Sequence, residues 1–122
     1  MTDFLDEAVL RPLLDAWQTA IAEHDAEGVA SLFTEDAVFQ GLQPHTIGRP
    51  GVERYYAGQP AGLTVDYRLL AVRHLGDEAV LGWAEADFTV GSEVRALLNL
   101  TVVARRTTEG WRLAHYHVSP RV

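Results

Sequence analysis

The sequence predicts an α+β fold, a cone in which N-terminal helices pack against a curved, mostly antiparallel sheet. Apolar side chains recur at helical spacing in the first third of the chain, whereas residues 65–118 form four extended runs rich in β-branched and aromatic residues. Helices followed by strands, without βαβ alternation, indicate this class. The length of 122 residues suits one domain, 1–122. Such a cone leaves a cavity between its sheet and helices, where we expect the functional site.

Three helices are predicted in the first half of the chain. The first begins near Leu10 or bends there, because Pro12 suits a first helical turn better than a helix interior. Asp25 can cap a second helix whose buried face ends at Phe33, and Pro50 can open a short third helix. The apolar stripe of the first helix consists of Leu10, Leu13, Leu14, Trp17 and Ile21.

Five strands are predicted, of which the last four form a meander. Residues 34–36 are expected to end the second helix, and a short strand follows at 37–40. Short turns rich in glycine and acidic residues separate the four later runs, and loops of this length join antiparallel neighbours. The four runs are Val65–Leu75, Ala79–Val90, Val94–Arg106 and Trp111–Val118.

Composition excludes several kinds of chemistry. The chain has no cysteine, and all ten of its basic residues are arginine, so thiolate nucleophiles, cysteine metal sites and lysine Schiff bases are absent. The net charge of −7 disfavours nucleic acid and anionic membranes as partners. The acidic N-terminus does not resemble a signal peptide, and no apolar run approaches the length of about 20 residues that a membrane span needs. We therefore expect a cytoplasmic protein. Dinucleotide-binding, P-loop, zincin and nucleophile-elbow motifs are also missing.

Three segments carry a resemblance to a known family. Residues 17–37, with the sequence WQTAIAEHD followed by VASLFTEDA, resemble the opening of the nuclear transport factor 2-like superfamily, and GRPGVERYY at 48–56 resembles its third helix. The ending RRTTEGWRLAHYHVSP at 105–120 resembles the SnoaL-like branch, and we expect a bacterial protein. The resemblance implies the cone fold. It does not define a reaction, because the superfamily includes isomerases, cyclases, dehydratases, epoxide hydrolases and non-enzymes.

The ketosteroid isomerases share this cone, and the resemblance allows a comparison with their acid and base groups. Trp17 stands where they have an oxyanion-hole tyrosine, and the position of their catalytic base falls at or beside Gly41. Their oxyanion-hole aspartate falls near Asn99 or Thr101. Enolising a ketone needs both a base and a strong proton donor. We therefore predict that this protein is not a ketosteroid isomerase.

His115 and His117 are the candidate catalytic pair. Residues at i and i+2 of a strand share a face, which the resemblance implies is the concave one. Two imidazoles in a pocket could serve as general acid and base. They could instead be hydrogen-bonded structural residues, or ligands of a metal completed by a third group such as His45. We predict no metal and no cofactor. The same face is expected to hold Trp111, Leu113 and Ser119.

Aromatic and amide side chains are the candidate ligand contacts. The resemblance places Asn99 and Thr101 inside the pocket, as hydrogen-bond donors to a ligand oxygen. They could instead satisfy one another or nearby backbone, and the aromatic residues could be plain core. The predicted ligand-binding set is Trp17, Phe39, Tyr55, Tyr56, Asn99 and Thr101.

Trp83, Glu85 and Asp87 share one face of their strand. We assign that face to the outside, because the alternate residues are apolar. If the face were concave, Asp87 would be the best available base, paired with Arg95 across the hairpin.

The function predicted from sequence is binding of a small hydrophobic molecule in an apolar pocket. One alternative is an acid/base enzyme, such as a polyketide cyclase, isomerase or hydrolase, acting on a small hydrophobic ring compound. Another is a non-catalytic dimerisation module. A homodimer is expected in any case, because the sheet is apolar on both sides.

Overall fold

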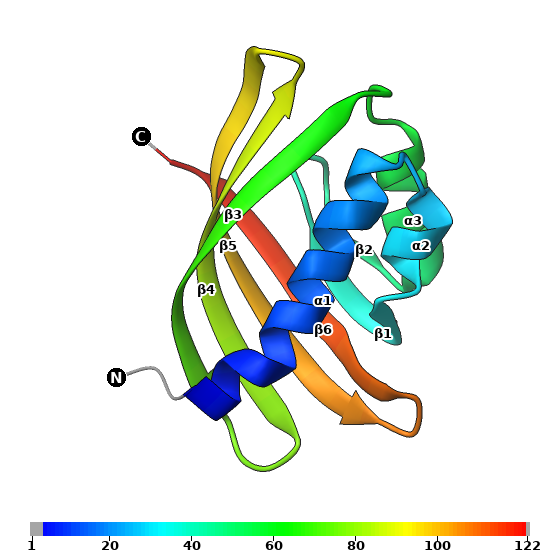
Figure 1. Ribbon diagram of the computed structural model, residues 1–122. Helices are drawn as coiled ribbons and strands as arrows, with labels where there is room; N and C mark the ends of the chain where they lie inside the picture. Colours follow the sequence, from blue (N-terminus) through cyan, green and yellow to red (C-terminus); the bar gives the residue numbers. More distant parts are fainter. Residues whose placement is uncertain (1–3, 122) are drawn as a thin grey trace.

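The computed structural model describes residues 4–121, with side chains from residue 7 onward, and in this part of the chain it has three helices and six strands (Figure 1). The helices are α1 (Phe4–Ala22), α2 (Ala26–Ala30) and α3 (Arg49–Ala57). The strands are β1 (Phe33–Gln40), β2 (Thr46–Ile47), β3 (Leu63–His74), β4 (Ala79–Val90), β5 (Glu93–Thr107) and β6 (Gly110–Pro120).

The strands form one curved sheet in the order β2-β1-β6-β5-β4-β3. All neighbouring strands are antiparallel except β1 and β6, which are parallel. Helix α1 lies obliquely across the concave side of the sheet, and α2 and α3 lie beside its C-terminal half (Figure 1). The predicted α+β cone is confirmed, including the four-stranded meander.

Helix α1 begins before the predicted start and continues through Pro12. A proline in a helix interior removes one backbone hydrogen bond, which costs about 3 kcal/mol or more. Burial of the predicted apolar stripe offsets this cost, since Leu10, Leu14 and Trp17 are fully buried. No helix in the described part of the chain has both the length and the hydrophobicity needed to cross a membrane.

Strand β1 is longer than predicted. The predicted end of the second helix at residues 34–36 belongs to this strand, which begins at Phe33. Helix α2 has already ended at Ala30, and its predicted cap is confirmed because the Gly28 backbone N–H donates to the Asp25 carboxylate at 2.9 Å. The pairing of β1 with β6 shifts in register between Phe33 and Val38, so regular alternation is interrupted there.

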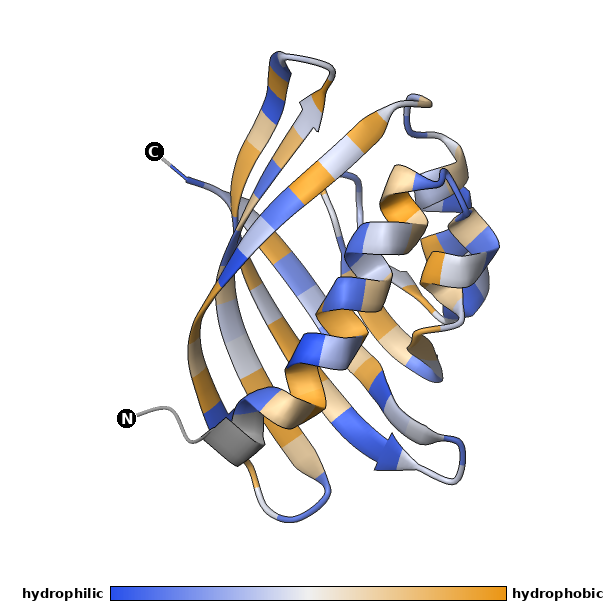
Figure 2. Ribbon diagram, viewed as in Figure 1, coloured by the Kyte–Doolittle hydropathy of each residue, from blue (hydrophilic) through white to orange (hydrophobic). Residues whose placement is uncertain are grey.

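The core lies between α1 and the concave face of the sheet, with Trp17 at its centre. The Trp17 ring meets the rings of Tyr67, Phe88 and Tyr116 edge-on at centroid distances of 6.4, 6.0 and 6.1 Å. Apolar and polar residues alternate along the strands, and apolar positions recur along α1 (Figure 2). On β5 the buried row is Leu98, Leu100, Val102 and Ala104.

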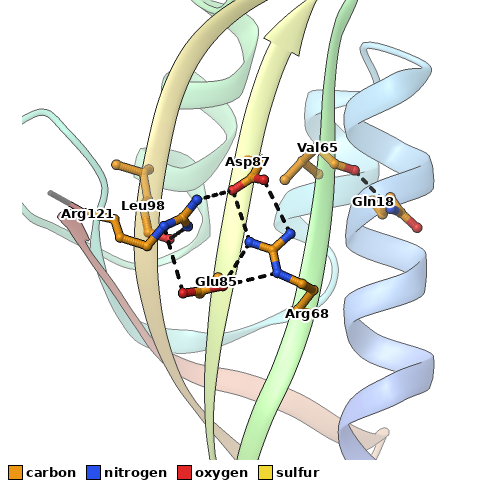
Figure 3. A network of polar contacts seen from close by, with 7 residues as sticks. All are labelled: Gln18, Val65, Arg68, Glu85, Asp87, Leu98 and Arg121. Carbon is orange, nitrogen blue, oxygen red and sulfur yellow. Dashed lines mark hydrogen bonds and ion pairs between the residues drawn. The ribbon is translucent and has the colours of Figure 1, made fainter.

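The outer face of β4 carries Trp83, Glu85 and Asp87, as predicted. The Trp83 side chain is 48% exposed, whereas the alternate Ala84 and Ala86 are buried. Asp87 is paired with Arg121 and Arg68, not with Arg95. The Arg121 guanidinium donates to its carboxylate at 2.7 Å, and Arg68 bridges Asp87 and Glu85 (Figure 3). Arg121 also donates to the carbonyl of Leu98 at 3.1 Å and so joins the C-terminal segment to two strands.

This charge network predicts an acid-dependent contribution to stability. The hydrogen bond from Arg121, followed by the one from Arg68, lowers the pKa of Asp87 in the folded protein. A lowered folded-state pKa stabilises the fold above the unfolded pKa, and this stabilisation is lost as pH falls through the folded-state value. We expect Asp87→Asn to cost about 1 kcal/mol or less at pH 7 and less at pH 3.

Urea unfolding at both pH values measures this difference. The control is Asp77→Asn, which removes an exposed carboxylate from the turn between β3 and β4. Equal effects of Asp87→Asn at pH 7 and pH 3 would contradict a role for the network in acid stability.

Candidate functional site

A pocket of about 190 Å³ opens on the concave side of the sheet, between α3, the loops that follow β1 and α3, and strands β3, β4, β5 and β6. Its walls include the apolar side chains of Leu63, Phe88 and Leu98. Tyr56 and Tyr116 lie at the inner end and are only 4% and 2% exposed. The mouth is formed by the more accessible Leu42, Gln59, Pro60 and Arg95.

A chain of hydrogen bonds reaches the inner end of the pocket. The Trp17 indole N–H donates to the Tyr56 hydroxyl at 3.1 Å, and Tyr56 donates to the Tyr116 hydroxyl at 3.2 Å. These three side chains come from α1, α3 and β6. Indole can only donate, so it sets the direction of the chain. The Tyr116 hydroxyl accepts from Tyr56, and its own proton has no acceptor among the described residues.

Both tyrosines stay neutral at physiological pH. Burial raises the pKa of Tyr56 above its ordinary value, and the hydrogen bond that it accepts from Trp17 partly opposes this effect. Burial is also the main cause that raises the pKa of Tyr116. The hydroxyls can therefore donate hydrogen bonds, but they are poor proton acceptors. The inner end of the pocket offers a neutral hydrogen-bond donor within an apolar surround.

An aromatic cluster holds these tyrosines in place. Phe39 stacks on Tyr116 at 4.6 Å with an interplanar angle of 19°, and it meets Tyr55 edge-on at 5.0 Å. The Tyr55 hydroxyl accepts a hydrogen bond from the Leu42 backbone N–H at 3.2 Å, which fixes the loop after β1. A Cβ at Gly41 would lie 2.6 Å from the Tyr55 ring. The position where the resemblance places the isomerase base therefore has no room for a side chain while Tyr55 keeps this place.

Four of the six predicted ligand contacts lie around the pocket. Tyr55 and Tyr56 line it directly, and Trp17 and Phe39 are buried immediately behind them. Sequence reasoning missed Tyr116, the residue whose hydroxyl ends the hydrogen-bond chain. Tyr116 lies between two histidines, and the prediction placed those histidines, and not Tyr116, on the concave face of β6.

The predicted concave placement of His115 and His117 is wrong. The pairing of β5 with β6 shifts in register between Val103 and Ala104, so one extra residue lies between Leu113 and His115. Because of this bulge, Leu113 and Tyr116 are both buried, whereas His117 is exposed on the outer face. Leu113, expected to share the face of the histidines, lies on the opposite one. The two imidazoles therefore do not line the pocket.

The predicted inward placement of Asn99 and Thr101 is also wrong. They alternate with Leu98, Leu100 and Val102, which are buried, so both polar side chains lie on the outer face. The Asn99 amide donates to the Ser119 hydroxyl at 3.4 Å, which agrees with the alternative that these residues satisfy polar neighbours. The wholly apolar row of this strand faces the core, as the hydrophobic effect requires.

No third ligand accompanies His115 and His117 in the described part of the chain, as a metal site would need. The rings of His115 and His117 lie 6.4 Å apart, but within residues 7–121 no three histidine, aspartate or glutamate side chains converge as a metal site would need.

This chain encloses a pocket between its helices and the concave face of a curved six-stranded sheet, which places it in the class of α+β cone proteins. The chain belongs to the SnoaL-like domain family, whose sequence model matches residues 10–122. No curated protein matches the sequence.

Solved structures share the fold at low sequence identity. A domain of unknown function with a cystatin-like fold from Nostoc punctiforme is 18% identical, with a TM-score of 0.85 over 99% of this chain and 80% of its own. A proposed dehydratase of the NTF2-like family from Streptomyces avermitilis is 24% identical, with a TM-score of 0.76 over 94% and 95%. A proposed calcium/calmodulin-dependent protein kinase type II association domain from Thiobacillus denitrificans is 18% identical, with a TM-score of 0.75 over 90% and 93%.

Proposed function

We propose that the protein binds a small, largely apolar molecule that carries a hydrogen-bond-accepting oxygen. The observation that carries the proposal is the Tyr116 hydroxyl proton, which has no acceptor among the described residues and lies at the inner end of an apolar pocket. A buried donor without an acceptor costs about 1–3 kcal/mol, and a ligand carbonyl or hydroxyl oxygen would remove that cost.

The size of the pocket limits the ligand. An apolar protein cavity of about 150 Å³ holds benzene. The pocket here has a volume of about 190 Å³, which suits a single ring with short substituents and is too small for a steroid. Steroid isomerisation is therefore not expected, in keeping with the positions of Trp17 and Gly41.

Two probes of nearly identical shape test this proposal. Acetophenone carries a carbonyl oxygen where α-methylstyrene carries a methylene group. We expect the protein to bind acetophenone about five- to tenfold more tightly, the gain from one hydrogen bond. Substituting Tyr116 alone would leave the Tyr56 hydroxyl proton without an acceptor, so the informative variant combines Tyr56→Phe with Tyr116→Phe. It should lose the preference for acetophenone.

Isothermal titration of both probes measures the preference. The control is Tyr67→Phe, which removes a hydroxyl that donates to Asp15 on the surface. Thermal melting shows whether each variant is folded. A folded double variant that still prefers acetophenone would contradict the role of the tyrosines. Failure of both probes to bind the wild type would contradict the proposal that the pocket binds small apolar molecules.

We also propose self-association through the outer face of the sheet. Trp83 and Leu97 are 48% and 42% exposed there, and the helices cover only the other face (Figure 1). Trp83 pairs with Thr101 and Thr101 with His117, so the exposed tryptophan shares a row with one of the histidines. A second copy would cover this apolar area. The likeness to an association domain supports the same proposal.

Sedimentation of the wild type should give twice the chain mass. We expect Trp83→Glu to give the monomer mass, because a charge would be buried in the interface. The control is Leu75→Glu, which changes an apolar residue of similar exposure, 55%, in the turn between β3 and β4. A monomeric wild type, or a Trp83→Glu variant that remains a dimer, would contradict this interface.

A further inference from the structure

Arg95 is the one charged residue among those that line the pocket. Neither a carboxylate nor an imidazole accompanies it in the lining. The chain as a whole carries a net charge of −7, whereas the side chains that line the pocket carry one positive charge and no negative one. An anion that reaches the mouth would meet a guanidinium, whose planar donors match the two oxygens of a carboxylate.

A β-bulge brings Arg95 to this position. Phe88 pairs with Ala96, and the next residue, Thr89, pairs with Val94. Arg95 therefore has no partner on β4 and is the extra residue of the bulge. Consecutive residues of a regular strand face opposite sides, yet both Arg95 and Ala96 line the pocket. Bulges redirect side chains in this way and occur often next to active sites.

The present partner of Arg95 is weakly held. Its guanidinium donates to the Glu93 carboxylate at 3.0 Å, but the two side chains are 47% and 71% exposed. Exposed pairs of this kind contribute little. Glu93 does not line the pocket, so an anionic group of a ligand could replace it without a large cost.

We propose that the ligand is an amphipathic ring compound with a carboxylate, which Arg95 binds at the mouth while Tyr116 holds an oxygen at the inner end. This inference rests on the proposed ligand-binding function and assigns Arg95 as the residue that selects carboxylates over neutral analogues. It adds a second polar contact, so the ligand has a defined direction in the pocket.

Acids with a fixed ring and a variable tether provide the test. The probes are 4-acetylbenzoate and 4-acetylphenylacetate, each compared with its methyl ester by isothermal titration. We expect at least one acid to bind the wild type about threefold to tenfold more tightly than its ester, with the difference shrinking at high salt. Arg95→Gln should remove the difference, because it should weaken binding of the acid much more than binding of the ester.

Two further variants control for charge. Arg106→Gln makes the same change near the other end of β5, outside the pocket, and should keep the preference for the acid. Glu93→Gln releases Arg95 from its partner and should keep or increase that preference. An acid and ester of equal affinity, or an unchanged preference in Arg95→Gln, would overturn this inference and leave the proposed function standing. Failure of acids and esters alike to bind would overturn both.

Discussion

Replacing Trp17 by alanine is expected to lower the free energy of unfolding by about 3–5 kcal/mol. The indole is fully buried, its ring meets three other aromatic rings, and its N–H begins the hydrogen-bond chain. Alanine would leave a large cavity between α1 and the sheet and remove a donor from Tyr56. Urea unfolding measures the loss, and a change of less than about 1 kcal/mol would contradict the central place of Trp17 in the core.

Trp17→Phe separates packing from hydrogen bonding. It keeps most of the buried ring but removes the N–H that makes Tyr56 donate to Tyr116. Either tyrosine can then donate to the other, so the Tyr116 proton is free in only part of the molecules. We expect acetophenone to bind about twofold more weakly, because only about half of the protein molecules would then have the Tyr116 proton available for the ligand. The affinity for α-methylstyrene, which accepts no hydrogen bond, should stay unchanged, so the preference for acetophenone should fall by the same factor. An unchanged or stronger preference would contradict this role of the Trp17 N–H.

Gly41→Val is expected to destabilise the protein by about 1–3 kcal/mol and to weaken ligand binding. A Cβ at this position would lie 2.6 Å from the Tyr55 ring, and an aromatic ring cannot yield as the end of a flexible side chain can. Displacing Tyr55 would break its hydrogen bond with the Leu42 backbone and move two residues that line the pocket.

A double-mutant cycle with Tyr55→Ala identifies the cause. If the clash with Tyr55 is responsible, Gly41→Val should cost much less stability in the Tyr55→Ala background than in the wild type. Urea unfolding of the four proteins measures the coupling. Additive effects would place the cost elsewhere, for example in the backbone of the loop.

The fold could be predicted from the sequence because periodicity reports burial directly. The stripe from Leu10 to Ile21 and the alternation along β4 depend on side chains in regular elements. The same alternation predicted the outer position of Trp83, Glu85 and Asp87. Where a strand stays regular, counting by two identifies its faces.

Two kinds of strand residue were assigned to the wrong face of the sheet. Some lie next to a β-bulge, and others were placed by the family resemblance and not by the pattern of apolar residues. The bulge before His115 shifts the count, so Tyr116 faces inward in place of its neighbours. Another bulge brings Arg95 to the pocket. Bulges depend on pairing between strands and leave little trace in one sequence. Asn99 and Thr101 lie on a regular strand, and their wholly apolar neighbours indicated the correct face.

The proposed function depends on a hydrogen bond that the Tyr116 hydroxyl donates to a ligand oxygen at the inner end of the pocket. Infrared spectroscopy of bound acetophenone can detect this bond, because a hydrogen bond to a carbonyl lowers its stretching frequency. We expect a carbonyl band below its frequency in hexane for the wild-type complex, and a return to the hexane value in the Tyr56→Phe, Tyr116→Phe variant. A wild-type band at the hexane frequency would mean that Tyr116 donates no hydrogen bond to the ligand.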